Sequence, residues 1–411
     1  MVGGWRAEEL CDFSSRGMRL FLAVLATFTQ QSLTYMTALV VPVAAPELSK
    51  IMKVPVAMAG YHMGLLYLFS SLSMLLVGGF IRRIGALRMS QIALMSMSVG
   101  LALGATGEVW AFALGAIIIG VFGSSSTPAS SDILARYAPP KYAAMIFSIK
   151  QTGVPAGGII AGIVVPYLYY NFGWQGIFYG TSAMCLILAL LLQPFRSLFD
   201  ENRNPNYRIS PVQAVHTLRE VLLPRPFRHL VYATFTYCGL QGIFAAFFVS
   251  YLVLELDFTL VEAGAIFALS QVASIVARIL WGWVMDRVGG ARPVLAVLGL
   301  SMAGFSVACA VMLPGWSELA VTLVAIAYSA TAISWHGVVL AAVAKLSRPE
   351  MVATNTGGVL AFAVSGQFVY PTIMGLILAL GGSFGTGFAF AALPACAVGI
   401  LFLRRPTDEE M

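Results

Sequence analysis

Long apolar runs, separated by short polar segments, make up almost all of the 411-residue chain. A helix needs about 20 apolar residues to cross the ~30 Å hydrocarbon core of a bilayer. Runs of that length occupy 18–43, 57–81, 89–107, 109–131, 143–169, 174–195, 229–254, 261–285, 293–313, 317–341, 353–380 and 384–403. The pattern predicts an all-α membrane protein with twelve transmembrane helices.

The longest polar stretch lies in the middle of the chain, at 196–228. It separates the runs into two sets of six, which predicts an N-terminal six-helix bundle at 1–195 and a C-terminal six-helix bundle at 229–411. The stretch itself is expected to be a cytoplasmic linker, in which 212–223 forms either a surface helix or solvated chain. The segment 8–19 likewise fits an interfacial helix or a polar tail.

Basic residues are unevenly distributed between the two sides that this topology defines. If both termini are cytoplasmic, 20 of the 24 lysines and arginines lie in cytoplasmic segments, and only Lys50 and Lys53 lie outside. Cytoplasmic loops of membrane proteins carry such an excess. We therefore expect a multi-pass protein of the plasma (inner) membrane with both termini in the cytoplasm. The net charge of +6 then needs no nucleic-acid partner.

Composition agrees with this class. Hydrophobic residues make up 59% of the chain and charged residues 10%, with a mean hydropathy of +0.85. Soluble domains carry about 25% charged residues. The five cysteines are scattered without the spacing of a metal or redox site, so neither a metal nor a cofactor is expected.

One polar turn occurs twice, at 78–88 and at 282–292, each time between two apolar runs. We call these segments the first turn and the second turn. They start 204 positions apart, about half the chain, which indicates an internal duplication. The first turn contains Gly78, Arg82, Arg83, Gly85 and Arg88, and the second turn contains Gly282, Asp286, Arg287, Gly289 and Arg292.

Both turns resemble motif A of the major facilitator superfamily, G-x-x-x-D-[RK]-x-G-x-[RK]-[RK]. In the second turn Ala291 takes one of the two closing basic positions, and in the first turn Arg82 stands where the family has aspartate. The resemblance implies the major facilitator fold, in which two pseudo-symmetric six-helix bundles work by alternating access about a midplane site. It also implies that the turns close a cytoplasmic gate.

The missing aspartate of the first turn leaves Arg82 without its usual partner. Asp132 is the acidic residue nearest that depth in the N-terminal half, and we hypothesise a swapped pair of Arg82 with Asp132. The alternative is that Asp132 pairs with Arg136, one turn along its own helix. In the second turn, the resemblance implies that Asp286 pairs with the arginines that follow it.

Two basic residues, Lys150 and Arg278, lie well inside apolar runs, where a charge costs about 2.5–3.5 kcal/mol. Lys150 is nine residues beyond Lys141 and Arg278 is eight residues before Asp286. Both therefore lie about 12–13 Å from the cytoplasmic side. Since no acidic residue lies at that depth, the expected partner of the two cations is an anionic substrate held between them.

The stretch VARILWG at 276–282 resembles helix 8 of the monocarboxylate transporters and the oxalate/formate antiporter group. This resemblance implies that Arg278 is the primary carboxylate ligand, with Lys150 as the second cation. The alternative is that Arg278 reaches helix carbonyls and has a structural role. Ser274 occupies the place of a proton-carrying aspartate in the monocarboxylate group, which leaves uniport, anion exchange and proton symport open.

Further candidates come from the helices that line the cavity in this fold. His336 is the strongest, as a titratable group near membrane depth that could bind an anion or carry a proton. Packing in the helix core is the alternative for each candidate. The others are Trp335, Tyr35, Gln241, Gln367 and Tyr370.

These features predict a secondary active or facilitative transporter of a small organic anion, with a monocarboxylate as the expected substrate. The alternatives are a multidrug exporter of the same superfamily and a non-transporting membrane sensor. No enzyme is expected, because the G-x-S-x-G match at 381–385 lacks the preceding strand that a nucleophile elbow needs. The expected partners are the anion, the lipid bilayer and a coupled proton or exchanged anion, and the protein is expected to be a monomer.

Overall fold

The computed structural model describes residues 7–139, 142–207, 225–348 and 352–404. Within these ranges the chain is a set of helices joined by short loops, and no strand occurs. The helices are α1 Ala7–Met52, α2 Met58–Ile84, α3 Ala86–Gly104, α4 Val109–Gly123, α5 Ser126–Tyr137, α6 Ala143–Gln151, α7 Gly153–Leu191, the 3-10 helix η2 Gln193–Phe195, α8 Arg196–Phe199, α10 Arg225–Leu254, α11 Leu260–Val288, α12 Ala291–Ala310, α13 Glu318–Ala332, α14 His336–Leu346, α15 Val352–Ala379 and α16 Phe384–Leu403. The all-α class is confirmed.

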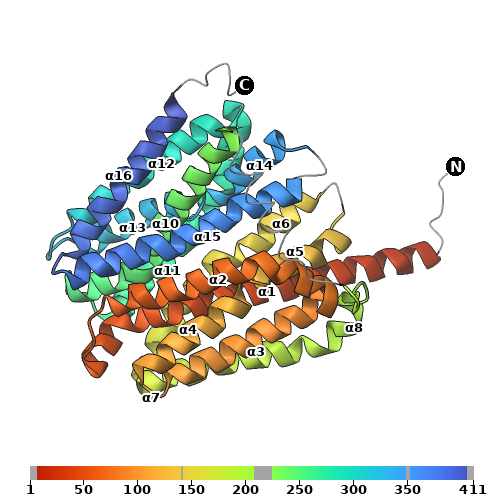
Figure 1. Ribbon diagram of the computed structural model, residues 1–411, viewed down its shortest axis with the longest axis horizontal. Helices are drawn as coiled ribbons and strands as arrows, with labels where there is room; N and C mark the ends of the chain where they lie inside the picture. The colour runs from red at the N-terminus through yellow and green to blue at the C-terminus, as the bar shows by residue number, and fades with distance from the viewer. Residues whose placement is uncertain (1–6, 140–141, 208–224, 349–351, 405–411) are drawn as a thin grey trace.

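Figure 1 shows the helices in two groups, with α1 to α8 in the lower part and α10 to α16 in the upper part. We call these groups the N bundle and the C bundle. In the N bundle α1 packs on α7 and α3 on α4, and in the C bundle α12 packs on α16 and α10 on α15. The bundles meet through α1 with α10, α2 with α15, and α7 with α11. The middle of the expected linker, 208–224, and with it the surface helix considered at 212–223, lies outside the described residues.

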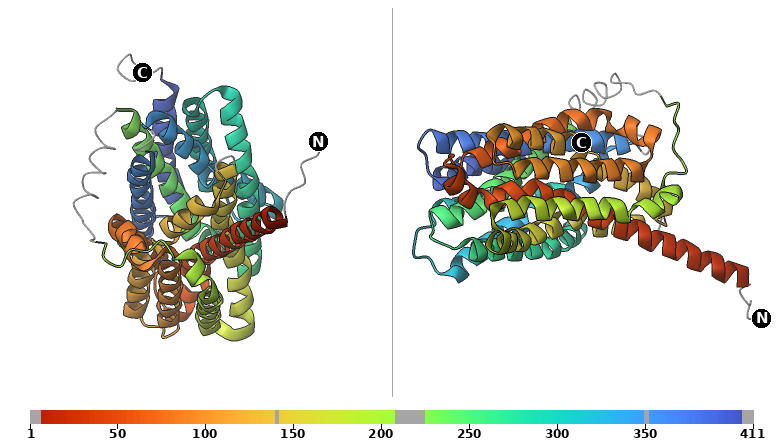
Figure 2. Two further views of the ribbon diagram at one scale, coloured as in Figure 1. Left: turned by 90° about the vertical axis from the view of Figure 1, so that its right-hand side faces the viewer. Right: turned by 90° about the horizontal axis from the view of Figure 1, so that it is seen from below.

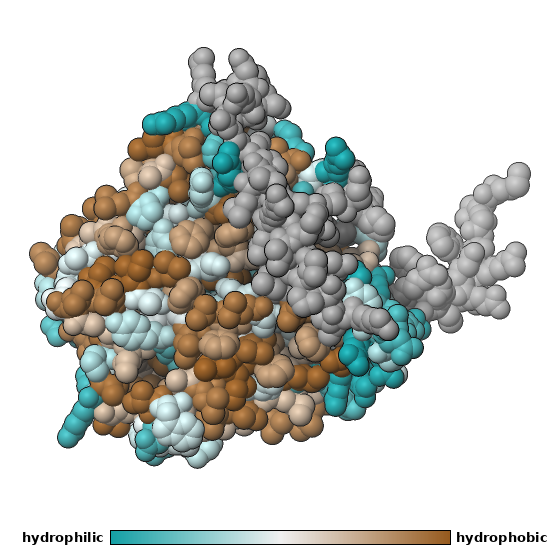
Figure 3. Space-filling view, in the orientation of Figure 1, coloured by the Kyte–Doolittle hydropathy of each residue, from teal (hydrophilic) through white to brown (hydrophobic). Residues whose placement is uncertain are grey.

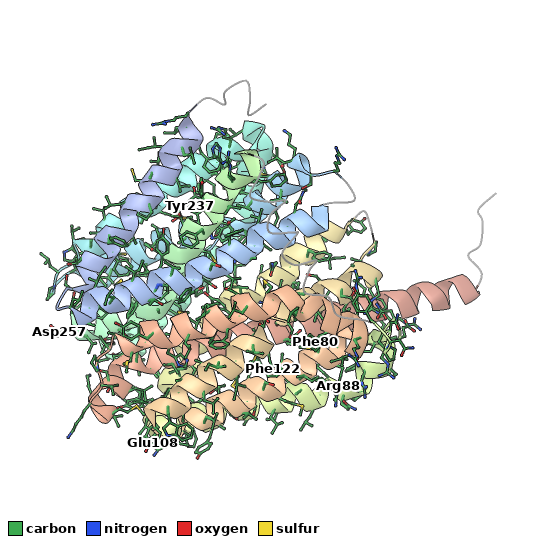
Figure 4. All side chains as sticks on the ribbon, viewed as in Figure 1. Phe80, Arg88, Glu108, Phe122, Tyr237 and Asp257 are labelled. Carbon is green, nitrogen blue, oxygen red and sulfur yellow. The ribbon has the colours of Figure 1, made fainter. Side chains whose placement is uncertain are left out.

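The molecule has two ends of different character. In Figure 1 the start of α1 and the short helix α8 lie at the right and the end of α16 lies at the top, and we call the side of the molecule that these segments occupy the terminus face. The opposite end, the loop face, carries the short loops before α2, α4, α11, α13 and α16. In Figure 4, Arg88 lies at the terminus face, and Glu108 and Asp257 lie at the loop face.

Nine helices of the described chain are long and apolar enough to cross a membrane, or up to ten if the bent pair Met58–Met74 and Leu76–Ile84 counts as one span. One of the nine, Met145–Phe199, is bent at Gly173, whose φ of 72° and ψ of −178° interrupt the helix. It therefore carries two of the apolar runs. The count is consistent with the twelve spans that the sequence predicts.

Helix α1 is longer than the apolar run at 18–43. It has 46 residues, and at 1.5 Å per residue it is about 69 Å long, more than twice the thickness of the hydrocarbon core. Its first part projects from the rest of the molecule at the terminus face (Figure 2). The segment 8–19 is therefore helical rather than an irregular tail.

Three of the apolar runs contain a break that divides one helix into two. α4 and α5 meet at Ser125, α6 and α7 at Thr152, and α13 and α14 at 333–335. The hydroxyls of Ser125 and Thr152 donate to the carbonyl oxygens three residues earlier, at 2.7 and 2.6 Å. Such bonds compete with the helix ladder. Broken helices occur within membranes where they line a cavity or are buried in protein.

The bundles approach each other most closely near the loop face. A Cβ atom added to Gly162 of α7 would lie 2.6 Å from the carbonyl oxygen of Gly264 in α11. An atom added to Gly64 of α2 would collide with the hydroxyl of Thr372 in α15. Such close helix contacts need small residues. The interface is therefore closed at this end by backbone packed against neighbouring helices.

Apolar side chains cover the outside of the helices. In Figure 3, brown residues dominate the middle of the surface, and teal residues gather near α8. Ile279, Leu393 and Leu190 are 69%, 68% and 63% exposed. Apolar exposure on this scale marks a surface that contacts another apolar phase, here the lipid bilayer.

Candidate functional site

A cavity of about 170 Å³ lies between the two bundles. It borders the three helix breaks, and we call it the central cavity. Its polar lining residues are Gln31, Thr34, Tyr35, Tyr67, Ser70, Ser124, Ser126, Thr127, Gln151, Gln241, Arg278, His336 and Gln367. Five of the predicted site residues, Tyr35, Gln241, Arg278, His336 and Gln367, thus surround one space.

Arg278 reaches the cavity from α11 and contacts both bundles. Its Nη1 donates to the Gln151 carbonyl oxygen at 3.3 Å, and its Nη2 donates to the Ile333 carbonyl oxygen at 2.9 Å. Both carbonyls lie at helix breaks. A guanidinium has five N–H groups, and the Nε of Arg278 has no partner among the described residues. Arg278 therefore binds helix carbonyls, as expected of a structural residue. It also keeps an unused N–H donor, as expected of a carboxylate ligand.

His336 is the first residue of α14 and follows the break at 333–335. Its ring stacks on the ring of Trp335, with centroids 3.8 Å apart and an interplanar angle of 18°. Its Nδ1 has no partner in the described chain. Trp335 is fully buried and is not part of the cavity lining. In this conformation it packs on the imidazole from outside the cavity lining, as in the packing alternative.

A hydrogen bond between the bundles joins two residues of the cavity lining. Nε2 of Gln241 in α10 donates to the hydroxyl oxygen of Tyr35 in α1 at 3.3 Å. The Oε1 of Gln241 has no partner within the described ranges. This pair connects the two bundles next to the arginine without using charge.

Lys150 lies in the last turn of α6, 1% exposed, and its Nζ has no partner in the described structure. The cavity lining contains the next residue, Gln151, but not Lys150. Successive residues of a helix point about 100° apart, so the expected depth did not place Lys150 on the cavity face. The expected two-cation clamp is not formed in this conformation.

Gln367 and Tyr370 of α15 also differ in whether they line the cavity. Gln367 lines the cavity, whereas Tyr370 does not. The ring of Tyr370 packs against Phe235, with centroids 5.6 Å apart, and covers Gly239 of α10. Its hydroxyl donates to Oγ1 of Thr236 at 3.4 Å. Tyr370 therefore fastens α15 to α10, which again is the packing alternative.

Neutral polar groups of the N bundle form part of the opposite wall. The hydroxyl oxygens of Thr34 and Ser126 are 2.8 Å apart, and Thr127 donates to Oε1 of Gln31 at 3.1 Å. These bonds fix α1 against α5. The described lining includes one arginine, one histidine and no carboxylate. The charge of the cavity therefore favours a negative ligand.

A second cavity of about 200 Å³ lies at the loop-face ends of α1, α2 and α4. Its lining is mostly apolar, with Ser49, Tyr61 and His62 as the residues that carry polar side-chain atoms. It lacks the convergent polar groups that distinguish a small-molecule site from a packing void. The central cavity is therefore the candidate site.

The first turn is covered by a residue that the sequence did not single out. Asp200, which follows α8, accepts hydrogen bonds from the backbone N–H groups of Leu87 at 2.7 Å and Arg88 at 2.9 Å. These groups start α3, where the helix dipole favours a carboxylate. Gly85 has a φ of 108° and leaves no room for a side chain beside Asp200. Burial raises the pKa of the Asp200 carboxyl, although both N–H bonds act in the opposite direction.

The chain after Asp200 also covers Arg82. The N–H of Asn204 donates to the Arg82 carbonyl oxygen at 2.8 Å, and Nη1 of Arg82 donates to the Tyr207 hydroxyl at 3.3 Å. Asp132 pairs with Arg136 at 3.3 Å instead. The hypothesised Arg82–Asp132 pair is therefore not formed in this conformation, and Asp132 instead pairs with Arg136 on its own helix face, the alternative at i,i+4 spacing.

The second turn has different contacts. Arg287 stacks on a neighbouring tryptophan ring at 4.8 Å from its centroid, and Nη2 of Arg292 donates to the Arg404 carbonyl oxygen at 2.8 Å. Asp286 is exposed, and no ion pair found among the described residues includes it. The expected pairing of Asp286 with these arginines is not formed in this conformation, in which both have other partners.

The remaining residues of the two turns have local roles. Gly289 ends α11 in the left-handed conformation, with φ of 79°. Nη1 of Arg88 donates to Oε1 of Gln91 at 3.3 Å. Arg83 is exposed, and Gly78 and Gly282 face open space.

Several residues of the site were not among the predicted ones. Tyr67, Ser70 and Gln151 line the cavity, and Asp200 covers the first turn. The i,i+3 spacing of Tyr67 and Ser70 in an apolar run was an available signal, because it places two polar groups on one helix face. Asp200 bonds to Leu87, 113 positions away, and nothing local in the sequence indicates that contact.

Comparison with known proteins identifies the family. Residues 20–340 match the model of the Major Facilitator Superfamily. A gallate transporter of Pseudomonas putida is 24% identical over 360 residues, which cover 80% of this chain and 79% of the relative. The multidrug resistance protein MdtG of Dickeya zeae is 24% identical over 254 residues, covering 59% of this chain and 60% of the relative.

Solved structures show the same fold. A bacterial homologue of the human lysosomal transporter Spinster, in an inward-facing and unoccupied conformation, superposes with a TM-score of 0.69 at 15% identity, covering 94% of this chain and 95% of the homologue. A POT family transporter in complex with a thioalcohol-conjugated peptide gives a TM-score of 0.73 at 14% identity, covering 93% and 95%. The chain belongs to the Major Facilitator Superfamily and is a membrane transporter, not an enzyme.

Proposed function

We propose that this transporter carries a small organic anion, with a monocarboxylate as the expected substrate, through the central cavity. The observation that supports this most directly is Arg278, a cation with an unpaired N–H group at a cavity whose described lining has no carboxylate. The guanidinium fork matches a carboxylate in two-point contact. His336 beside it could add a second positive group when it is protonated.

One relative supports the anionic class. The Pseudomonas putida protein is by its name a transporter of gallate, which is an organic anion. Its 24% identity is low, so the substrate proposal rests on the charge of the cavity. The finer comparison with the monocarboxylate transporters rests on the stretch at 276–282 and stays a prediction.

Transport is proposed to occur by alternating access, in which the two bundles rock about the central cavity. In the present conformation the contact of Gly162 with Gly264 closes the interface toward the loop face. Substrate would therefore enter or leave at the terminus face. The distribution of basic residues supports a cytoplasmic terminus face and an inner-membrane location. A monomer suffices, because one chain encloses the whole cavity.

The mode of coupling is also a proposal. Ser274 is buried and donates to the Gln271 carbonyl oxygen at 2.8 Å, so it supplies no titratable group. His336 is then the candidate proton carrier of the cavity. Uniport and anion exchange remain the alternatives, and simultaneous measurement of anion and proton flux in proteoliposomes separates the three modes.

A multidrug exporter is the second candidate function, supported by the similarity to MdtG and by apolar lining residues such as Met74 and Met97. Export of lipophilic cations usually needs a buried carboxylate, and the described lining offers none. The third candidate, a non-transporting sensor, would bind the anion without carrying it. Ligand flux in proteoliposomes separates the sensor from both transporters.

The test is binding of benzoate to the purified protein, followed by thermal shift, and uptake of labelled benzoate into proteoliposomes. We expect Arg278→Gln to weaken binding at least 10-fold, because a charge-assisted hydrogen bond contributes about 1.5–3 kcal/mol. Lys345→Gln, at an exposed position of α14, removes the same charge outside the cavity and is the matched control. Stabilisation by lipophilic cations, or benzoate binding that Arg278→Gln leaves unchanged, would show that the anion proposal is wrong.

A further inference from the structure

The central cavity has two chemically different ends. Arg278 and His336 reach it from α11 and α14, beside the α6–α7 break. Tyr67 and Ser70 reach it from α2, and Gln367 reaches it from α15. The contact of α2 with α15 and the contact of α7 with α11 are separate meeting places of the bundles. The charged residues of the described lining therefore reach the cavity from α11 and α14, whereas α2 and α15 contribute neutral polar groups, and we call the part of the cavity formed by α2 and α15 the neutral end.

The neutral end has unused hydrogen-bonding capacity. In the described chain, no other protein group bonds to the side-chain polar atoms of Tyr67, Ser70 or Gln367. The neighbouring Thr34 and Thr127, by contrast, are satisfied within the N bundle. Polar groups withdrawn from bulk water are costly unless water or a ligand supplies a partner. A group that both donates and accepts can use all of this capacity, including the amide oxygen of Gln367, which only accepts.

A simple carboxylate lacks that property. When ionised it only accepts, so it satisfies Arg278 but offers nothing to the amide oxygen of Gln367. An ammonium group donates, but it would bring a second positive charge to a cavity with no described carboxylate. A hydroxyl both donates and accepts and has no charge. It is the group that fits Tyr67, Ser70 and Gln367 together.

We propose that the substrate is a hydroxylated carboxylate, with its hydroxyl at the end of the molecule remote from the carboxylate. The carboxylate binds Arg278, the carbon body lies along the apolar part of the lining, and the hydroxyl binds Tyr67, Ser70 and Gln367. This inference rests on the proposed function, because it uses Arg278 as the anchor of the carboxylate. On this proposal, the side chains of α2 and α15 discriminate between anions of similar size by binding or not binding a hydroxyl group.

The first test compares ligands of one shape on the full-length protein. Benzoate, 4-hydroxybenzoate and 2-hydroxybenzoate differ only in the presence and place of one hydroxyl. We expect 4-hydroxybenzoate to bind about 3- to 10-fold more tightly than benzoate, the gain from one added hydrogen bond in a site built to receive it. 2-Hydroxybenzoate should gain nothing, since its hydroxyl lies beside the carboxylate. Butyrate and 4-hydroxybutyrate form a second matched pair without a ring.

The second test removes the partners of the hydroxyl. Gln367→Met keeps the size of the side chain without its amide, Ser70→Ala removes a hydroxyl, and Tyr67→Phe removes another. Each variant should reduce the affinity ratio of 4-hydroxybenzoate to benzoate, and the double variant of Ser70→Ala with Gln367→Met should bring it to about 1–2. Gln175→Met, at an exposed loop-face position, is the matched control and should keep the wild-type ratio.

The outcomes separate this inference from the proposed function. If benzoate and 4-hydroxybenzoate bind equally and both lose affinity in Arg278→Gln, the hydroxyl inference is wrong and the anion proposal stands. If neither probe binds, or Arg278→Gln leaves both unaffected, the anion proposal fails and this inference fails with it. If the variants keep the wild-type ratio, α2 and α15 do not read the hydroxyl. Should a variant fail to fold, the wild-type ratios of the two ligand pairs decide.

Discussion

The first turn and the second turn share a sequence frame but have different surroundings. The first turn is covered by the chain that follows α8, with Asp200 bonded to the start of α3 and Tyr207 beside Arg82. In the second turn Asp286 is exposed, and Arg292 binds carbonyls at the end of α16. A duplicated motif therefore does not imply duplicated contacts.

The two turns differ in which part of the chain supplies the carboxylate beside them. The second turn carries its own aspartate, Asp286, which is exposed and forms no ion pair with the described residues. The first turn has Arg82 at that position and takes its carboxylate from Asp200, outside the motif. Because Asp200 belongs to the same bundle as α3, it fixes the first turn within that bundle. Asp286 remains available for contacts that form only when the bundles move.

The largest change in the free energy of unfolding should come from replacing the glycines of the two turns. Gly85→Ala places a side chain at φ 108° and against Asp200, so we expect a loss of about 2–4 kcal/mol from backbone strain and overpacking together. Gly289→Ala meets open space at φ 79° and should lose only about 1–2 kcal/mol from the left-handed backbone. Thermal unfolding of the two variants in detergent measures the difference. Equal losses would mean that Asp200 does not pack on Gly85.

The second effect concerns the two carboxylates. Asp200→Ala leaves two N–H groups of α3 without partners, and we expect a loss of about 2–3 kcal/mol. Asp286→Ala removes an exposed side chain and should stay within about 0.5 kcal/mol of wild type. Asp200→Asn, which keeps one acceptor oxygen, should fall between these values. A destabilised Asp286→Ala with an unaffected Asp200→Ala would reverse the comparison.

A smaller effect is expected at Arg82. Tyr207→Phe removes the hydroxyl that accepts from Nη1 at 3.3 Å but keeps the ring, whose centroid lies 5.4 Å from the Arg82 guanidinium carbon. Because the bond is exposed, the loss should be about 0.5 kcal/mol or less. Tyr207→Ala removes both contacts and should cost more than Tyr207→Phe. If the two variants unfold at the same temperature, the ring does not hold Arg82.

The smallest effect is a pH dependence specific to the first turn. Burial raises the pKa of Asp200 above its ordinary value, so the folded protein holds this proton more tightly than the unfolded chain. The resulting stabilisation is fully present below the pKa of an unfolded aspartate, about 3.9, and is lost as the pH rises through the folded pKa. The Tm of wild type minus that of Asp200→Asn should therefore decrease as the pH rises over this window. A difference that grows with pH would show that the N–H bonds outweigh burial.

The elements of the fold were largely predictable from the sequence. A bilayer imposes one length and one polarity on every spanning segment, so runs such as 18–43 and 384–403 stand out without any knowledge of their contacts. The helix breaks at Thr152 and at 333–335 were not predicted. They depend on whether neighbouring groups donate hydrogen bonds to the freed carbonyl oxygens, as Arg278 does to those of Gln151 and Ile333.

The sequence predicted how deep in the membrane the site residues lie, but not which side of each helix faces the cavity. Counting residues along a helix placed Lys150 and Arg278 at one level, yet Gln151 rather than Lys150 faces the cavity. A change of one residue rotates the side chain by about 100°, and a break in the helix shifts that rotation again. Arg278 and His336 were found because charge and titratable groups are rare in lipid. Tyr67 and Ser70 are neutral, so their only signal was the weaker one of i,i+3 spacing.

The loop-face contact of Gly162 with Gly264 also has a consequence for how the protein responds to its medium. The contact joins backbone to backbone and contains no charged group. Dissolved salt screens charges over about 8–10 Å at physiological ionic strength, but it leaves uncharged contacts of this kind nearly unaffected. The closure at the loop face should therefore keep the same strength from dilute to saline media. The arginine-rich terminus face, which by the proposed topology meets the buffered cytoplasm, should be the salt-sensitive side.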